Sequence, residues 1–277
     1  MTEPSSDFDI ELQLLLDAIY LKYHFDFRQY ARASLARRVR TALERFRCST
    51  VSQLQDQILR DPVRFQEVLN LLTVPVSEMF RDPRYFLALR HVAVPLLRTY
   101  PSLKIWVAGC STGEEAYSFA ILLREEDLLE RTLIYATDIN ASTLAKAEAG
   151  IYDVDRIAGF TESHRQSGGK SSLSDHYTAA YGRAMLDKSL KAHIVFSDHS
   201  LATDSVFAEM QLVSCRNVLI YFNRPLQERA LGLFHQSLCR NGFLGLGSKE
   251  TVRLSSYAEA FTEVAEGQRL YQKRGDA

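Results

Sequence analysis

The sequence predicts an α/β protein in which an all-helical N-terminal domain precedes a doubly wound sheet. Two observations lead to this prediction. Up to about residue 90 no strand pattern interrupts a series of segments with helix-start signals, and from residue 103 short apolar runs alternate with helical segments. Such alternation is typical of a parallel sheet covered by helices. The chain has 277 residues and 46% hydrophobic content, enough for one large domain and one smaller domain.

The N-terminal part is predicted to contain a disordered segment and a helical domain. We expect residues 1–8 to be disordered and residues 9–90 to form helices joined by short turns. Thr50 begins a capping box with the glutamine three positions later. Asp61 and Asp82 each precede a proline, so each is expected to cap a helix that begins at that proline.

An arginine-rich segment lies within this helical region. Residues 22–47 contain eight Lys or Arg and two Asp or Glu, a local balance of +6 in a chain of net charge −1. Apolar residues repeat along one face of the helix predicted here, and the opposite face carries Arg37, Arg40 and Arg47. Such a face is often only solvated, but arginine binds carboxylates bidentately. We therefore expect an acidic protein surface as the partner, and the overall charge does not favour nucleic acid.

The remaining residues, 91–277, are predicted to form the sheet domain. Strands are expected at 104–108, 133–137, 193–197, 210–215, 243–247 and 269–272, and helices at 114–126, 142–149 and 225–240. Residues 151–192 break this alternation and predict a loop with a small antiparallel insertion. The edge of such an insertion can pair with an extended peptide.

The most informative motif is KIWVAGCSTGEEAYS at residues 104–118, which predicts a strand, a tight loop and the start of a helix. Gly109 and Gly113 allow a ligand to approach the backbone N–H groups of the first helical turn. Glu114 and Glu115 would each oppose a phosphate charge by roughly 4 kcal/mol at about 4 Å, for an effective dielectric near 20. The pair favours a cationic ligand such as a sulfonium nucleoside, although acidic residues in a first turn also complement the helix dipole.

A second acidic residue supports a nucleoside site. The strand at 133–137 is followed by Asp138, 25 residues beyond Gly113. An acid at the end of the second strand is placed to bind the two hydroxyls of a ribose. The alternative is that Asp138 belongs to the cap of the next helix.

Composition narrows the class of protein further. No uninterrupted apolar run reaches the roughly 18 residues of a membrane-spanning helix, and the polar N-terminus lacks the features of a signal peptide. We therefore expect a cytoplasmic protein without direct membrane insertion. The four cysteines lack metal-ligand spacing, so reduced thiols are expected and no metal is.

With these motifs the chain resembles the CheR family of S-adenosylmethionine-dependent methyltransferases, which methylate glutamates on the cytoplasmic helices of chemoreceptors. The resemblance extends over nearly the whole chain and rests on SEMFRDPRYF at 77–86, WVAGCSTGEEAYS at 106–118, ATDIN at 136–140, CRNVLIYF at 215–222 and GFLGLGSKE at 242–250. It implies a helical N-terminal domain, a Rossmann-like class I methyltransferase domain, and a small antiparallel β subdomain inserted within it.

The resemblance also implies roles for individual residues. Contacts to S-adenosylmethionine are implied for Ser77, Arg81, Glu115, Asp138, Ser200, Leu201, Arg216 and Asn217. Arg81 is further implied to contact the substrate carboxylate, and Tyr221 to lie beside the methyl group in transit. Arg81 could instead pair with Asp82 or Glu78, and Tyr221 could be a core aromatic. The chain departs from the family at Pro75 and Ser200, where the family usually has asparagine.

The function implied is protein-glutamate O-methylation, which yields glutamate methyl esters and S-adenosylhomocysteine for sensory adaptation. The implied partner is the cytoplasmic domain of methyl-accepting chemoreceptors, docked through Arg37, Arg40 and Arg47, with a receptor peptide at the β subdomain. One alternative is a non-catalytic S-adenosylmethionine-sensing module in a signalling array. Another, an NAD-dependent oxidoreductase, is disfavoured by the two glutamates in the phosphate position.

Overall fold

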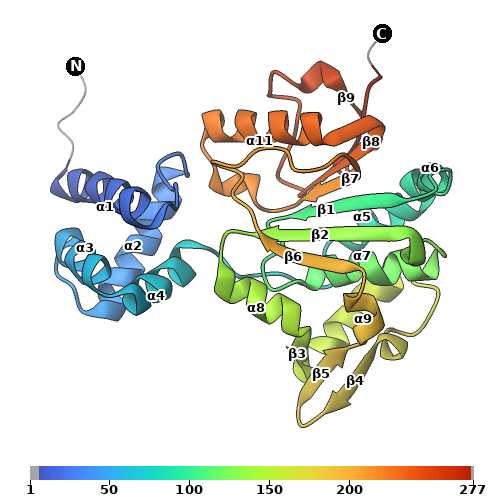
Figure 1. The fold of residues 1–277 in the computed structure, drawn as a ribbon, viewed down its shortest axis with the longest axis horizontal. Coiled ribbons are helices and arrows are strands. Elements are labelled where there is room, and N and C mark those ends of the chain that lie inside the picture. The colour runs from blue at the N-terminus through green and yellow to red at the C-terminus, as the bar shows by residue number, and fades with distance from the viewer. Residues whose placement is uncertain (1–5, 276–277) are drawn as a thin grey trace. The chain divides into compact units, whose positions relative to one another are not determined.

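The computed structural model describes residues 6–275 and contains two compact units (Figure 1). One unit comprises the described residues up to Pro75 together with Tyr221–Gln227, and the other comprises Val76–Ile220 and the described residues from Glu228 onward. The division falls before Val76, earlier than the boundary expected near residue 90. The reason is that apolar side chains from Met79 onward belong to the core of the sheet unit.

The first unit is helical, as predicted. It consists of α1 (Asp7–Tyr23), α2 (Arg32–Phe46), α3 (Val51–Arg60) and α4 (Pro62–Leu72). Each helix turns one apolar face toward a common core, to which α1 contributes four fully or nearly buried aliphatic side chains. Of the segment expected to be disordered, residues 1–5 lie outside the described residues, whereas Asp7 and Phe8 already belong to α1.

Two of the three predicted helix caps are confirmed. The Thr50 hydroxyl accepts a hydrogen bond at 3.2 Å from the backbone N–H three residues later, and the Asp61 carboxylate caps α4. For Asp82 the position is confirmed, because α5 begins at the following proline, but the capping hydrogen bond is absent. Asp82 precedes α5 (Pro83–Ala88) with a positive φ of 55°, and its side chain makes no cap hydrogen bond. It forms an ion pair with Arg216 instead, at 2.7 Å.

The second unit contains a seven-stranded sheet in the order β6-β2-β1-β7-β8-β10-β9. The strands are β1 (Leu103–Ala108), β2 (Thr132–Asp138), β6 (Ile194–Asp198), β7 (Met210–Cys215), β8 (Leu238–Leu246), β9 (Phe261–Ala265) and β10 (Leu270–Lys273). The first five in this order pair in parallel, and β10 is antiparallel to both its neighbours. The doubly wound sheet is confirmed, and β9 was not predicted.

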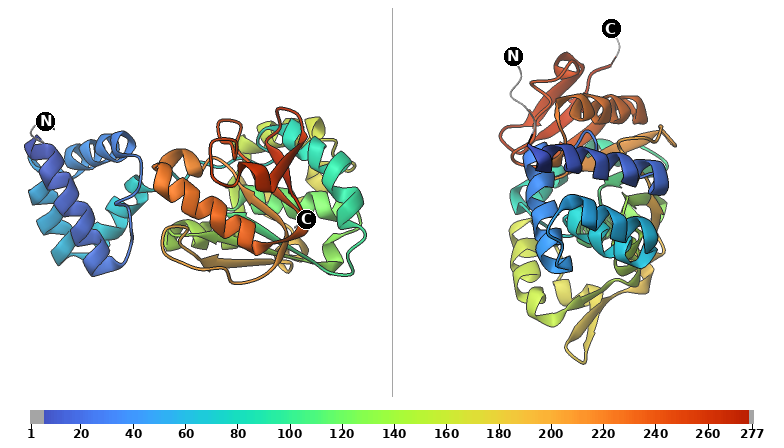
Figure 2. Two further views of the ribbon diagram at one scale, coloured as in Figure 1. Left: turned by 90° about the horizontal axis from the view of Figure 1, so that it is seen from above. Right: turned by 90° about the vertical axis from the view of Figure 1, so that its left-hand side faces the viewer.

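Helices cover both faces of the sheet (Figures 1 and 2). The helices α7 (Glu114–Glu125), α8 (Ala141–Ala149) and α11 (Arg224–Ser237) agree with the prediction, except that α11 ends earlier because β8 begins at Leu238. Successive side chains of a strand point to opposite faces. Accordingly Ile105 and Val107 of β1 join the core cluster that includes α7, whereas Trp106 contacts Phe234 of α11 edge-on.

Shorter helical segments connect these elements. A π-helical turn, Leu89–Ala93, continues α5 and leads into α6 (Val94–Leu97). The segment Leu129–Arg131 precedes β2, and Leu219–Tyr221 precedes α11. None of the helices in the described part of the chain is long and apolar enough to cross a membrane.

The insertion forms the antiparallel β subdomain that was expected. Its strands β3 (Ile151–Asp153), β5 (Arg183–Leu186) and β4 (Tyr177–Ala180) form a separate sheet in the order β3-β5-β4. The insertion also contains α9 (Ile157–Gln166) and the short α10 (Lys188–Lys191), where only loop was expected. Ile157, Phe160 and His164 form the buried face of α9.

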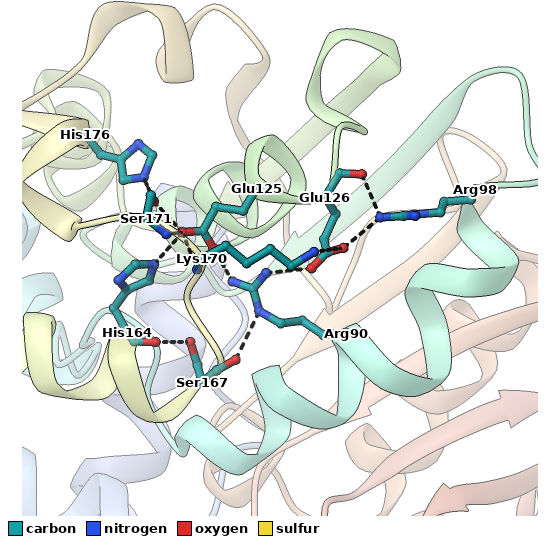
Figure 3. A network of polar contacts seen from close by, with 9 residues as sticks. All are labelled: Arg90, Arg98, Glu125, Glu126, His164, Ser167, Lys170, Ser171 and His176. Carbon is teal, nitrogen blue, oxygen red and sulfur yellow. Dashed lines mark hydrogen bonds and ion pairs between the residues drawn. The ribbon is translucent and has the colours of Figure 1, made fainter.

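A buried polar network attaches the insertion to α7 (Figure 3). Arg90 forms ion pairs with both Glu125 and Glu126, and all three side chains are at most 5% exposed. From the insertion, His164 Nε2 lies 2.9 Å from Glu125 Oε1, and Lys170 Nζ lies 2.7 Å from Glu126 Oε2. Burial alone would raise the pKa of Glu125, but hydrogen bonds from His164, Ser171 and Arg90 lower it below its usual value.

Candidate active site

The loop after β1 has the backbone geometry that its glycines predict. Gly109 and Gly113 have φ values of +73° and +92°, and Ser111 between them has +51°. A Cβ on Gly109 would lie 2.5 Å from a methyl group of Val218, and one on Gly113 would lie 2.8 Å from Cβ of Ala147. Glycine is therefore required at both positions, both for conformation and for close packing.

Asp138 lies beside this loop at the carboxyl end of β2. Its Oδ2 accepts a hydrogen bond from the Ser111 N–H at 2.9 Å, and its Oδ1 accepts one from the Asn140 N–H at 2.9 Å. Burial raises the pKa of Asp138 although these N–H groups oppose the shift. A carboxylate has about four lone-pair positions, so each oxygen can accept a further hydrogen bond, as a ribose diol requires.

Two of the predicted cofactor contacts, Glu115 and Arg216, form an ion pair with each other. Glu115 Oε2 lies 3.1 Å from Arg216 Nη1, and Glu115 Oε1 accepts a hydrogen bond from the Ser214 hydroxyl at 2.7 Å. The Arg216 side chain is 1% exposed, also pairs with Asp82, and stacks at 4.2 Å over the ring of Tyr85. Its positive charge is thus offset by two carboxylates.

Glu114 is buried rather than a solvated charge at the start of α7. Its residue exposure is 0%, and its Oε1 pairs with Arg156 Nη1 at 2.7 Å. Its Oε2 accepts a hydrogen bond from the Thr112 hydroxyl at 2.7 Å. Arg156 belongs to the insertion, and no local sequence pattern indicates this contact because the partners are 42 residues apart.

The loop after β7 carries Arg216 and Asn217 and is organised by Glu250. The Glu250 carboxylate accepts hydrogen bonds from the backbone N–H groups of Gly247, Asn217 and Ile220, at 2.6, 3.0 and 3.2 Å. Burial raises the pKa of Glu250, against these hydrogen bonds. The sequence analysis did not predict this role. The available signal was that Glu250 is an acidic residue at the end of the largely apolar GFLGLGSKE motif.

Arg81 is half-buried and flanked by two residues with positive φ. Phe80 has a φ of +52° and Asp82 a φ of +55°, and non-glycine residues rarely adopt such values. Within residues 6–275 the Arg81 side chain forms no ion pair: Asp82 pairs with Arg216 instead, and the exposed Glu78 does not pair with Arg81. Neither pairing that could have neutralised Arg81 is therefore formed.

The other predicted cofactor residues lie on two further segments. Ser77 is half-buried, and its carbonyl accepts a hydrogen bond from Arg156. Ser200 and Leu201 follow β6, the strand next to β2, so they lie at the same carboxyl edge as Asp138. Leu201 is buried, and the Ser200 hydroxyl accepts a local hydrogen bond from the N–H two residues on, at 3.3 Å.

Tyr221 belongs to the helical unit, as its contacts show. Its carbonyl accepts a hydrogen bond from the Ala31 N–H at 2.8 Å, and the Arg38 guanidinium lies 4.5 Å from the centre of its ring. Arg38 is 8% exposed, and its Nη2 has no hydrogen-bond partner among the described atoms. The sequence analysis did not identify Arg38, because Arg38 lies in the arginine-rich segment that was predicted to be exposed.

The arginines predicted for docking are exposed on the helical unit. Arg37 and Arg40 lie on α2, and Arg47 follows its end with a φ of +54°. In the described part of the chain none of the three forms an ion pair, although the Arg40 guanidinium stacks over Phe8 at 4.3 Å. Their charge is available to an external partner.

The residues at the carboxyl edge fit a nucleoside better than a phosphate or a metal. The Ser111 hydroxyl and Asn217 Oδ1 are buried and have no hydrogen-bond partner in the described part of the chain, so a polar ligand would satisfy them. The Asp138 carboxylate binds the loop directly, and no cation pairs with it among residues 6–275, which disfavours an anion there. No group of three or more His, Cys, Asp or Glu side chains among residues 6–275 could hold a metal ion.

Comparison with known proteins agrees with these observations. Residues 75–267 match the domain described as the SAM-binding domain of CheR methyltransferase, and residues 10–73 match the CheR all-alpha domain. Cher3 of Pseudomonas putida is 60% identical over 96% of this chain and 97% of that protein. The chemotaxis protein methyltransferase of Listeria monocytogenes is 30% identical over 82% of this chain and 84% of that protein. Chemotaxis protein methyltransferase 2 of Pseudomonas aeruginosa is 29% identical over 80% and 78% of the two chains.

Proposed function

The chain belongs to the CheR methyltransferase family, and on that basis we propose that it methylates glutamate side chains on the cytoplasmic domains of chemoreceptors. Its cofactor is S-adenosylmethionine, and its general activity is methyl transfer in chemotaxis. The proposal concerns the acceptor, the residues that bind both substrates, and a cytoplasmic location.

The observation that carries the proposal is Arg81. A half-buried arginine without an ion pair among residues 6–275 is suited to bind a carboxylate bidentately. Its backbone is fixed on both sides, because its own carbonyl accepts a hydrogen bond from Arg216 at 2.8 Å and its neighbours have strained φ values. Strain of this kind is concentrated at functional sites. Arg81 is thus the proposed contact of the acceptor glutamate.

Bound S-adenosylmethionine supplies a methyl group on a positively charged sulfur. We assign the ribose hydroxyls to Asp138, whose two oxygens retain acceptor capacity. Glu115 contributes negative charge, moderated by Arg216, near the start of α7. The remaining contacts are proposed for the segments that carry Ser77, Arg81, Ser200, Leu201, Arg216 and Asn217.

The reaction needs no general base. A glutamate has an unperturbed pKa of about 4.3, so the acceptor is already ionised near neutral pH. The protein's task is orientation, to which well-aligned intramolecular reactions assign roughly 7–11 kcal/mol. Arg81 would orient the acceptor carboxylate, and Tyr221 is the proposed neighbour of the methyl group in transit.

Two surfaces are proposed for the receptor. The exposed Arg37, Arg40 and Arg47 would contact acidic side chains of the receptor helices. A receptor peptide would bind the β subdomain at the free edge of β4. Where β4 pairs with β5 there is also a pocket of about 370 Å³, lined by Asp175, Tyr177, Thr178, Met185, Leu186, Asp187 and Lys188.

The test is methylation of a panel of receptor cytoplasmic fragments with S-adenosylmethionine labelled in its methyl group. Label in at least one fragment, absent from fragments whose glutamates are replaced by glutamine, is the expected result. Binding of the cofactor with no transfer to any fragment would favour a non-catalytic sensing module instead. Tight binding of NADH would favour the oxidoreductase alternative.

A further inference from the structure

Arg156 connects the insertion to two segments of the cofactor site. Its Nη1 pairs with Glu114 Oε1 at 2.7 Å, and its Nη2 donates a hydrogen bond to the carbonyl of Ser77. Glu114 begins α7 directly after the glycine loop, and Ser77 lies in the segment that leads to Arg81. One guanidinium therefore joins three parts of the chain that are distant in sequence.

A second residue of the insertion contacts the same loop. The Tyr152 hydroxyl donates a hydrogen bond to the carbonyl of Thr112 at 2.8 Å, and the Thr112 hydroxyl donates to Glu114. The Arg156 guanidinium also lies 4.8 Å from the centre of the Phe160 ring in α9. The insertion thus binds the backbone of the glycine loop at Thr112 and the side chain of Glu114, the first residue of the helix that follows the loop.

Burial distinguishes this contact from an ordinary surface ion pair. The Glu114 side chain is 0% exposed, and Arg156 is the only cation with which it pairs among the described residues. A buried carboxylate that loses its cation is strongly destabilised and tends to move toward water or take up a proton. Either response would displace the first turn of α7, where Glu115 follows directly.

We propose that Arg156 is a positioning residue through which the insertion sets the affinity for the cofactor. It fixes the first turn of α7 and the Ser77 segment in one arrangement, so that both contact the cofactor together. The inference rests on the cofactor contacts proposed above for Ser77 and Glu115. It assigns to the insertion a role at the cofactor site in addition to any role in binding a receptor peptide.

Three variants test the proposal: Arg156→Ala, Arg156→Lys and the control Arg165→Ala. Lysine keeps a positive charge for Glu114, but a single ammonium cannot reproduce the fork that reaches both partners. Arg165 lies on α9 of the same insertion and forms an exposed ion pair with Glu162, with side chains 73% and 50% exposed. It is therefore matched in residue type and region.

The measurement is the Kd for S-adenosylhomocysteine by calorimetry, together with the melting temperature of the ligand-free protein. A charge-assisted hydrogen bond is worth roughly tenfold or more in an equilibrium constant. We expect Arg156→Ala to raise Kd at least about tenfold, Arg156→Lys to give an intermediate value, and Arg165→Ala to leave Kd unchanged.

A purely structural role would lower the melting temperature of Arg156→Ala and leave its Kd within twofold of the wild type, and that result overturns the proposal. If Arg156→Ala does not fold, Arg156→Lys decides, and an unchanged Kd in that variant is equally contrary. The experiment uses no receptor. Failure of receptor methylation would therefore count against the proposed function without affecting this inference.

Discussion

Replacing Arg90 with alanine tests the buried network that attaches the insertion to α7. The Arg90 side chain is 4% exposed, pairs with Glu125 and with Glu126 at 2.8 Å, and donates to the carbonyl of Ser167 at 3.0 Å (Figure 3). Removing one partner of a buried ion pair costs about 3–5 kcal/mol, because the other charge stays buried without compensation.

The contacts that remain in this variant place the expected loss at the lower end of that range. Glu125 keeps its hydrogen bonds from His164 and Ser171, and Glu126 keeps Lys170 and Arg98. We therefore expect a loss of about 3 kcal/mol, a large part of the 5–15 kcal/mol typical of a folded protein. For a unit of this size the melting temperature should fall by roughly 6–12 °C.

Urea unfolding followed by circular dichroism measures this loss, with Arg98→Ala as the matched control. Arg98 pairs with the same Glu126, but its side chain is 50% exposed, so its loss should cost only about 0–1 kcal/mol. If the two units unfold separately, the transition of the sheet unit is the one that should shift. Equal losses below about 1 kcal/mol for both variants would refute the reasoning from burial.

Further predictions concern catalysis, docking, the cofactor loop and pH. Arg81→Ala should lower kcat at least about a hundredfold, the loss of one positioned charge contact, while the Kd for S-adenosylhomocysteine stays measurable; unchanged turnover of labelled methyl groups would contradict its role. Reversing Arg37 and Arg40 to glutamate should raise the KM for receptor fragments and weaken its salt dependence, and a KM indifferent to both salt and charge reversal would exclude this surface. Glu250→Gln should weaken S-adenosylhomocysteine binding by roughly tenfold, since the amide oxygen cannot replace both carboxylate oxygens; calorimetry giving the wild-type Kd would disprove this. Folding lowers the pKa of Glu125, so its carboxylate stabilises the protein above its unfolded pKa of 4.5, and this stabilisation should be lost as the pH falls below that value. Urea unfolding at a series of pH values would measure the loss. A free energy of unfolding that stays constant down to pH 3 or so would contradict the prediction.

Local patterns in the sequence predicted the sheet and the position of Asp138 beside the glycine loop. The strand-loop-helix order at residues 104–118 and the acid that ends β2 depend only on neighbouring residues, and the parallel sheet then brings them to one edge. The sequence therefore predicted that Asp138 lies beside the glycine loop, as observed in its hydrogen bond to Ser111.

Contacts between distant residues were not predictable in this way. Glu115 and Arg216 were each identified, but their ion pair joins positions 101 residues apart, and no local pattern encodes it. The same is true of Asp82, whose pairing with Arg216 prevailed over the helix cap that its proline neighbour indicates. Tertiary contacts overrode the local preference there.

Among the elements that were not predicted, α9 and β9 were missed for different reasons. The buried face of α9 includes His164, which does not count as apolar in a hydrophobic pattern although it packs at 4.8 Å against the ring of Phe80. The strand β9 is short and mixes polar with apolar residues, so only its antiparallel pairing with β10 defines it. In both cases the partner element supplies the information that the segment lacks.

The chemical nature of the methylated product tests the central claim most directly. A glutamate methyl ester is hydrolysed by mild alkali and releases methanol, whereas a methylated nitrogen does not. The proposed function predicts that receptor fragments incubated with the protein and labelled S-adenosylmethionine release their label as volatile methanol after alkali, and that Arg81→Ala reduces this signal sharply. Label that withstands alkali, or cofactor binding with no label in any receptor fragment, would contradict glutamate methylation.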